Sequence, residues 1–170
     1  MIRILRLISV LLILAGCAAA PVLPQRPALH EIKTFTLTGR LSVRQGEQRH
    51  HLSLTWRHTQ ERDELLLTTP FGQGVAEIVS ENAGARLKLA DGREIAAADA
   101  AALAETVLGF RLPLAATARW LLGEVGETEG WTVRVLEREG EAPHALPTLI
   151  EFERGEIIVR LKIDAWEALR

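Results

Sequence analysis

The strongest constraint on the fold is an alternation of apolar and polar residues that recurs along most of the chain. In TFTLTGRLSVR, the apolar side chains Phe35, Leu37, Leu41 and Val43 are separated by even numbers of residues. Successive side chains of a strand point to opposite faces of its sheet, so this period predicts a strand with one apolar face. Similar patterns predict strands at 51–56, 64–69, 74–80 and 131–137, and hairpins at 86–95 and 146–163. We therefore expect an antiparallel sheet of about nine strands.

Two helices are expected to interrupt this pattern. The Ala-rich run 97–109 predicts a helix that Asp99 caps and Gly109 ends. A second helix is expected after Pro113, ending at Gly123. The expected fold class is therefore α+β, with a twisted antiparallel sheet that wraps two short helices.

The first sixteen residues have the features of a signal peptide. Arg3 and Arg6 precede an apolar run that is shorter than the roughly 20 residues a membrane-spanning helix needs. The run ends in LAGC, which matches the lipobox of bacterial lipoproteins, and Cys17 is the only cysteine in the chain. We expect residues 1–16 to be removed and Cys17 to carry the lipid. Ala18, where an Asp would favour the inner membrane, indicates the outer membrane.

The remainder is expected to form a lipidated tether at 17–30 and one domain at 31–170. The tether contains three prolines and no hydrophobic period. Loss of two arginines with the signal peptide would change the formal net charge from −2 to −4. The remaining Lys and Arg are scattered, so no nucleic-acid-binding surface is expected.

The sequence gives little indication of enzyme chemistry. The adjacent His50 and His51 would point to opposite faces of a strand, and with His58 they are expected to be exposed edge residues. Neither a G-x-S-x-G nor an H-E-x-x-H motif occurs in the chain. We expect no catalytic residue, no metal and no cofactor.

The stretch TTPFGQG at 68–74 departs from the strand pattern. Pro70 tends to end a strand and Gly72 favours a loop, yet Phe71, one of only four phenylalanines, lies between them. Phe71 could fold back onto the sheet edge as a minor core residue, or it could project from a loop tip. The residues alone leave both possibilities open.

These segments, considered in order, resemble the LolB family of outer-membrane lipoproteins. The lipobox LAGC, the strand FTLTGRLSV, LLLTTPFGQGVAEI, LKLADGRE with the Ala-rich helix, LGFRLPL, RWLLG and a closing hairpin with RLKIDAW occur in the family's order. The resemblance implies a half-open antiparallel β-barrel, with helices forming a lid over an apolar cavity. Better-known members have an extra strand where this chain has only residues 124–130, so we expect a barrel one strand shorter and more open there.

The resemblance also implies a function and its partners. Members of this family receive lipoproteins from the soluble periplasmic carrier LolA and insert them into the outer membrane, while anchored by lipid on its periplasmic face. The acyl chains move without covalent chemistry, so the chain is not expected to be an enzyme. The expected partners are LolA, acylated lipoprotein cargo and outer-membrane lipid, and the chain is expected to be a monomer.

Two sites follow from the resemblance. Pro70, Phe71 and Gly72 match the family's membrane-insertion loop, which carries an apolar residue at its tip. The inward strand faces and the helices are expected to line the acyl-chain cavity, through Phe35, Leu37, Leu41, Leu54, Trp56, Leu67, Ile78, Leu89, Leu103, Val107, Trp120, Val159 and Leu161. Two alternatives remain: a structural or assembly lipoprotein that binds a protein partner, and a periplasmic hydrolase.

Overall fold

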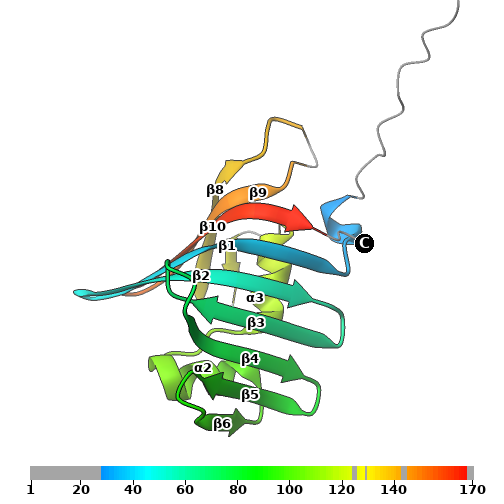
Figure 1. Cartoon of the computed structure of the whole chain (residues 1–170). Helices are drawn as coiled ribbons and strands as arrows, with labels where there is room; N and C mark the ends of the chain where they lie inside the picture. Colours follow the sequence, from blue (N-terminus) through cyan, green and yellow to red (C-terminus); the bar gives the residue numbers. More distant parts are fainter. Residues whose placement is uncertain (1–27, 124–125, 129, 143–144, 168–170) are drawn as a thin grey trace, which may run out of the picture.

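The alternating segments form the strands of one curved antiparallel sheet (Figure 1). The computed structural model describes residues 28–123, 126–128, 130–142 and 145–167, and these form ten strands in the order β6-β5-β4-β3-β2-β1-β10-β9-β8-β7. The sheet is not closed, because β6 and β7 are its two edges. The strands are β1 Phe35–Gln45, β2 Gln48–His58, β3 Arg62–Thr68, β4 Gly74–Glu81, β5 Gly84–Leu89, β6 Glu94–Ala97, β7 Gly126–Thr128, β8 Trp131–Arg138, β9 Pro147–Arg154 and β10 Ile157–Glu167.

Nine of these strands coincide with the segments that the apolar period predicted, and the tenth is β7. Residues 126–128 pair antiparallel with β8, so the expectation of a missing strand between 124 and 130 is wrong. Three residues are too few to show an alternating period, which explains why the sequence pattern did not reveal β7. The expected half-open α+β architecture is confirmed.

The two helices begin and end close to where the sequence predicted. Helix α2 spans Ala100–Leu108, and its N-cap Asp99 accepts a 2.7 Å hydrogen bond from the backbone N–H of Ala102. It ends at Gly109, whose φ of 78° places it in the left-handed region that glycine tolerates. Helix α3 spans Leu114–Leu121. A short 3₁₀ turn, η1 (Leu29–Glu31), falls at the end of the expected tether, where Leu29 packs against the core.

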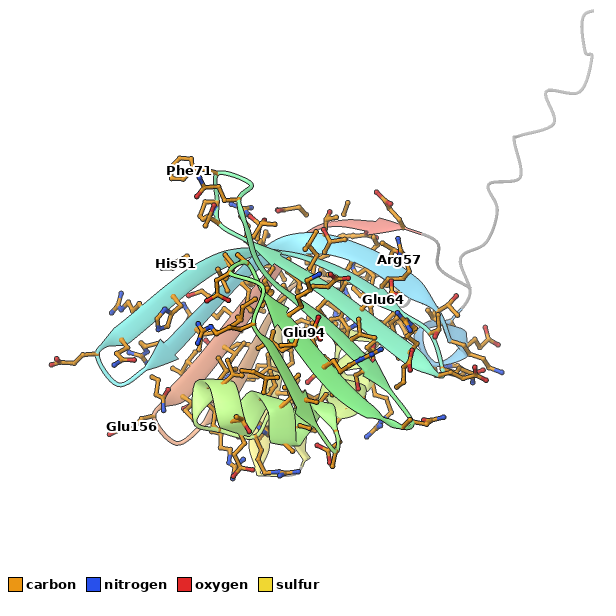
Figure 2. The ribbon with its side chains drawn as sticks, turned by 60° about the horizontal axis from the view of Figure 1, so that its bottom comes forward. His51, Arg57, Glu64, Phe71, Glu94 and Glu156 are labelled. Carbon is orange, nitrogen blue, oxygen red and sulfur yellow. The ribbon has the colours of Figure 1, made fainter. Side chains whose placement is uncertain are left out.

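Both helices lie on the concave side of the sheet (Figures 1 and 2). Helix α3 belongs to the main core, because Trp120 packs against Trp131 and Phe152 of β8 and β9 at ring distances of 6.5 and 5.6 Å. Helix α2 instead packs against β5 and β6, where Leu103 joins a smaller cluster with Ala76 and Leu87. All of this described core lies within residues 28–167, so a chain that begins at Ala18 retains every contact that forms it.

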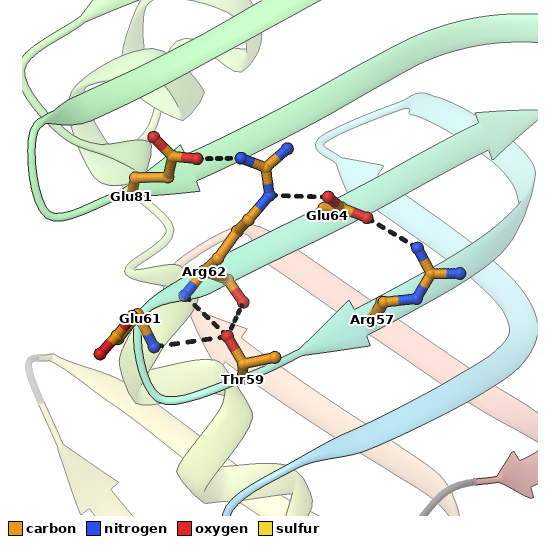
Figure 3. Close-up of polar contacts among 6 residues, drawn as sticks. All are labelled: Arg57, Thr59, Glu61, Arg62, Glu64 and Glu81. Carbon is orange, nitrogen blue, oxygen red and sulfur yellow. Dashed lines mark hydrogen bonds and ion pairs between the residues drawn. The ribbon is translucent and has the colours of Figure 1, made fainter.

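The convex side of the sheet is polar and carries ion pairs across neighbouring strands. Arg62 bridges Glu64 of its own strand and Glu81 of β4, and Arg57 of β2 contacts the other oxygen of Glu64 (Figure 3). The hydrogen bond from Arg62 is the largest cause that holds the pKa of Glu64 below its usual value, and the bond from Arg57 is the second. Thr59 closes the adjacent β2–β3 turn, with its hydroxyl donating to the Arg62 carbonyl at 3.1 Å.

The three histidines of β2 do not share one environment. His50 and His51 are exposed, and their opposite cross-strand partners, Val43 and Ser42, place them on opposite faces as expected. The expectation that His58 is a solvated edge residue is wrong. Its ring stacks near Phe35 at 4.8 Å, and its Nδ1 lies 2.7 Å from an oxygen of Asp63, so it packs at the rim of the core.

Candidate functional site

A cavity of about 260 Å³ lies between the concave face of the sheet and the helices. It is lined by twenty-two residues, of which only Trp56 and Thr117 carry a polar side-chain atom. Both polar groups are already bonded: Trp56 Nε1 donates to Asp63 at 2.8 Å, and the Thr117 hydroxyl donates to the Pro113 carbonyl at 2.8 Å. The lining therefore offers a guest no unpaired hydrogen-bonding group, which suits an apolar occupant and disfavours water.

Ten of the residues that the sequence suggested for a cavity line this one. They are Leu41, Leu54, Trp56, Leu67, Ile78, Leu89, Leu103, Val107, Val159 and Leu161. They come from β1 to β5, β10 and α2, so segments far apart in the chain converge on one apolar space.

Three residues suggested for the cavity lie elsewhere. Trp120 is fully buried between Trp131 and Phe152, because α3 fills the concave space beneath β8 and β9. Phe35 and Leu37 are buried at the start of β1, where the Phe35 ring contacts Trp166 and Trp56 at 5.3 and 5.5 Å. The cavity thus extends from β5 beneath α2 across to β9, and it excludes the start of β1 and the part of α3 that carries Trp120.

The other twelve lining residues were not identified from the sequence. Several continue a period that the sequence did contain: Leu52, Leu65, Ala76 and Leu87 occupy inward strand positions, and Ala100, Ala104 and Leu108 extend one face of α2. Val75, the second residue of β4, lines the cavity beside the β3–β4 loop. Phe152 occupies an inward position of β9, and the remaining three, Leu112, Leu114 and Thr117, depend on how α3 and its preceding loop pack against the sheet.

The cavity has an apolar mouth at the C-terminal end of α2. Val107 and Leu108 line the cavity, yet their side chains are 45% and 42% exposed. Leu67 and Val75, on either side of the β3–β4 loop, belong to the same lining. The mouth and the loop therefore lie at the same end of strands β3 and β4.

The β3–β4 loop projects from the sheet with Phe71 at its tip, where the side chain is 95% exposed (Figure 2). Phe71 is not folded back on the sheet edge. Pro70 occupies the second position of a β-turn closed by a 2.9 Å bond from Gly72 N–H to the Thr69 carbonyl. Gly72 has a φ of 85°, and Thr69 also bonds to Gln73 through backbone and side chain. These bonds hold the apolar tip away from the sheet.

The described residues contain neither a cluster of metal-binding side chains nor a helix that could span a membrane. In that part of the chain no three His, Cys, Asp or Glu side chains gather closely enough to hold a metal ion. None of the helices described there is long and apolar enough to cross a membrane. Cys17, the expected lipid-attachment residue, and the expected signal peptide at 1–16 lie outside the described residues.

A solved structure shares the fold of this chain. A LolA superfamily protein from Nitrosomonas europaea superposes with a TM-score of 0.52 over 82% of this chain and 87% of its own, at 10% identity. Likeness at this identity concerns the fold alone.

Sequence comparisons extend over nearly the whole chain. The model of the family "Outer membrane lipoprotein LolB" matches residues 33–166. Among relatives named outer-membrane lipoprotein LolB, that of Dechloromonas aromatica is 35% identical over 91% of this chain and 92% of its own. Those of Azoarcus sp. and Chromobacterium violaceum are 33% and 31% identical, over 93% and 98% of this chain and 91% and 100% of their own. The chain therefore belongs to the LolB family of outer-membrane lipoproteins.

Proposed function

We propose that the apolar cavity holds the acyl chains of a lipoprotein while Phe71 leads them into the membrane. LolB proteins receive lipoproteins from LolA and insert them into the outer membrane, and they are receptors rather than enzymes. The observation that carries the proposal is the combination, within one chain, of a cavity without unpaired polar groups and an exposed apolar loop at the same end of the sheet.

The size of the cavity indicates how an acyl chain enters. Its volume of about 260 Å³ is slightly below the roughly 300–1,000 Å³ of typical ligand pockets. An incoming chain must therefore displace part of the lining. Helix α2 is the element that can move, because its main contacts are with β5 and β6 near one edge of the sheet, whereas α3 is fixed by its buried tryptophan.

Phe71 has properties suited to a transient membrane contact. Burying its side chain contributes about 1.5–3 kcal/mol. This is too little to anchor a protein and enough to favour reversible entry into a bilayer surface. The backbone bonds of the turn keep the tip exposed before it meets lipid, so little ordering cost accompanies insertion.

Permanent attachment is assigned to the N-terminal segment. We propose that residues 1–16 are removed, that Cys17 carries the lipid and that residues 17–30 serve as a tether. Acyl chains each contribute about 0.8 kcal/mol per buried CH₂, so two or more anchor a protein stably. We further propose that one copy suffices, since the cavity and the loop belong to the same chain.

Family membership sets aside the two alternatives, a structural lipoprotein and a hydrolase. The proposed roles of individual residues are tested by a transfer assay. LolA loaded with a labelled lipoprotein is mixed with liposomes and with the chain from Ala18 onward. The wild type is expected to move the label into the liposomes. Phe71→Glu is expected to take the label from LolA and retain it, because a charged tip does not enter lipid.

A matched control places the same charge at another exposed apolar residue. Leu136 on β8 is 45% exposed, so Leu136→Glu adds a carboxylate to the surface away from the β3–β4 loop. We expect it to transfer cargo like the wild type. If Phe71→Glu delivers cargo at the wild-type rate, Phe71 has no role in insertion. If neither the wild type nor Phe71→Glu takes the label from LolA, the cavity is not the acyl-chain site.

A further inference from the structure

Basic residues gather on the convex side of the sheet, beside the loop that carries Phe71. Three adjacent strands contribute Arg40 and Arg44 from β1, Arg49 from β2, and Arg160 and Lys162 from β10, which together we name the basic strip. The strand register places them in consecutive cross-strand rows: Lys162, Arg40 and Ser53; then Arg160, Ser42 and His51; then Ile158, Arg44 and Arg49. Neighbouring strands are about 4.8 Å apart, so these cations form one continuous surface.

Part of the basic strip is neutralised by carboxylates. Arg40 binds Asp164 at 2.8 Å, Lys162 forms an ion pair with Glu137, and Arg160 binds Glu151 at 2.6 Å. Arg44 and Arg49, by contrast, contact no carboxylate within the described ranges, and both are exposed.

Arg44 and Arg49 also face each other directly across the β1–β2 pair. Like charges in this position repel and lower the stability of the pairing. At the other end of the convex face, cations alternate with Glu64 and Glu81 instead (Figure 3). Two facing guanidinium groups without a carboxylate form a place where an external anion would relieve the repulsion.

The basic strip is continuous with the β3–β4 loop. Ser53, at the end of its first row, pairs with Thr68, the last residue of β3. A shallow groove of about 320 Å³ joins Arg40, His51, Arg160 and Lys162 to Pro70 of the loop itself. In Figure 2, Phe71 projects on the side of the sheet away from α2, and the labelled His51 lies on that same side. The groove therefore joins three cations of the basic strip, Arg40, Arg160 and Lys162, to Pro70, the residue next to the apolar tip.

We propose that the basic strip binds the phosphate groups of anionic phospholipids in the membrane that Phe71 enters. The inference rests on the proposed role of Phe71 and adds the lipid class that the surrounding surface recognises. An apolar residue that enters the interface and cations that meet the headgroups act together, because apolar burial and electrostatic attraction both increase membrane affinity. Two contacts on one face also fix which side of the sheet turns toward the bilayer, which a single apolar tip cannot do.

The test compares binding of the chain from Ala18 onward to two kinds of vesicle, without cargo or carrier. One kind contains phosphatidylcholine alone and the other contains phosphatidylglycerol in addition. The double variant Arg44→Gln/Arg49→Gln removes the two cations that no described carboxylate contacts. Each cation near an anionic surface contributes about fivefold in affinity, so we expect binding to phosphatidylglycerol vesicles to fall by at least about fivefold.

A matched control removes two cations from the same face at the opposite side of the loop. Arg86 and Lys88 of β5 line a separate groove, which they share with Glu77 and Glu94. Arg86→Gln/Lys88→Gln makes the same change in net charge, and we expect it to bind phosphatidylglycerol vesicles like the wild type. Equal losses in both double variants would mean that net charge alone governs binding, and wild-type binding by Arg44→Gln/Arg49→Gln would overturn the proposal directly.

Failure of the basic strip can be separated from failure of the Phe71 loop. Phe71→Glu is expected to weaken binding to phosphatidylcholine vesicles, on which Arg44→Gln/Arg49→Gln should have no effect. Added salt is expected to reduce only the increment in binding that phosphatidylglycerol provides, since exposed charges are screened within about 10 Å at 0.1 M. Phe71→Glu could bind phosphatidylcholine vesicles like the wild type while phosphatidylglycerol still increases binding. That result would contradict the proposed role of the loop and support the proposal for the basic strip.

Discussion

At the scale of single residues, Gly39 lies where the backbone of a neighbouring strand leaves no room for a side chain. It lies in the middle of β1, which pairs with β2 on one side and β10 on the other. The register of β1 and β10 shifts between Thr38 and Gly39, which brings the two backbones unusually close. A Cβ atom at Gly39 would lie 2.4 Å from the carbonyl oxygen of Lys162. Only glycine fits there without moving a strand.

Gly39→Ala is therefore expected to lower the free energy of unfolding by about 1–3 kcal/mol, as overpacking in a core does. The measurement is urea denaturation of the chain from Ala18 onward. Gly74→Ala is the control, because nothing lies within 4 Å of its added Cβ and its φ is not positive. There the change should be neutral or stabilising by up to about 1 kcal/mol, since alanine restricts the unfolded chain. Equal stability of both variants would contradict the close approach of β1 and β10.

At the scale of elements, the C-terminal strands are tied together by one buried carboxylate. The side chain of Glu151 on β9 is only 6% exposed, and it accepts hydrogen bonds from Arg134 of β8 at 2.7 Å and Arg160 of β10 at 2.6 Å. The bond from Arg134 is the largest cause that holds the pKa of Glu151 below its ordinary value of 4.5. Glu151 therefore links three adjacent strands through charge-assisted bonds.

We expect Glu151→Gln to lower the free energy of unfolding at neutral pH by on the order of 1–3 kcal/mol. Because the pKa of Glu151 is lower in the folded state, its contribution is complete above pH 4.5 and is lost as the pH falls through the folded value. The difference between wild type and variant should therefore shrink below pH 4.5, measured by denaturation at a series of pH values. Glu156→Gln, at the exposed β9–β10 turn (Figure 2), is the control, and it should leave the free energy of unfolding at neutral pH unchanged.

The sequence patterns predicted the strands and helices themselves, but they did not show how those elements pack together. Alternation over four or more residues predicted nine strands, and the cap Asp99 and the stop Gly109 marked both ends of α2. The pattern could not separate cavity from core, because a side chain that lines a void and one that packs against α3 are equally apolar. Trp120 is the clearest case: its place on a helix was predicted correctly, but its neighbours depend on the crossing of α3 over β8 and β9.

At the scale of the whole molecule, the cavity exists because the two helices cover the sheet unequally. Helix α3 fills the concave space beneath β8 and β9 with Trp120, while α2 presents the smaller Leu103, Ala104 and Ala100 toward β4 and β5. The short side chains of Ala100 and Ala104 on α2, opposite Ala76 on the sheet, leave room that a fully packed core would not contain. Ala76 of β4 lies in this region, between Leu67 and Leu89 of the neighbouring strands, and all three line the cavity.

Ala76→Phe would place an aromatic ring into the cavity from its floor. Because the space is already empty, the ring should fit without forcing neighbours apart, and the free energy of unfolding should stay the same or rise. The ring would occupy volume that an acyl chain needs. We therefore expect the affinity for a fluorescent fatty-acid analogue to fall at least about tenfold, with stability and binding measured on the same preparation.

Val79→Phe supplies the comparison on the same strand. Val79 pairs with Glu64 and Arg86 on the convex side, so its larger side chain leaves the cavity unchanged. It should bind the analogue like the wild type. A stable Ala76→Phe variant that keeps full affinity would show that acyl chains are held elsewhere on the molecule. Loss of affinity in both variants would show that the sheet as a whole, rather than the space beneath it, determines binding.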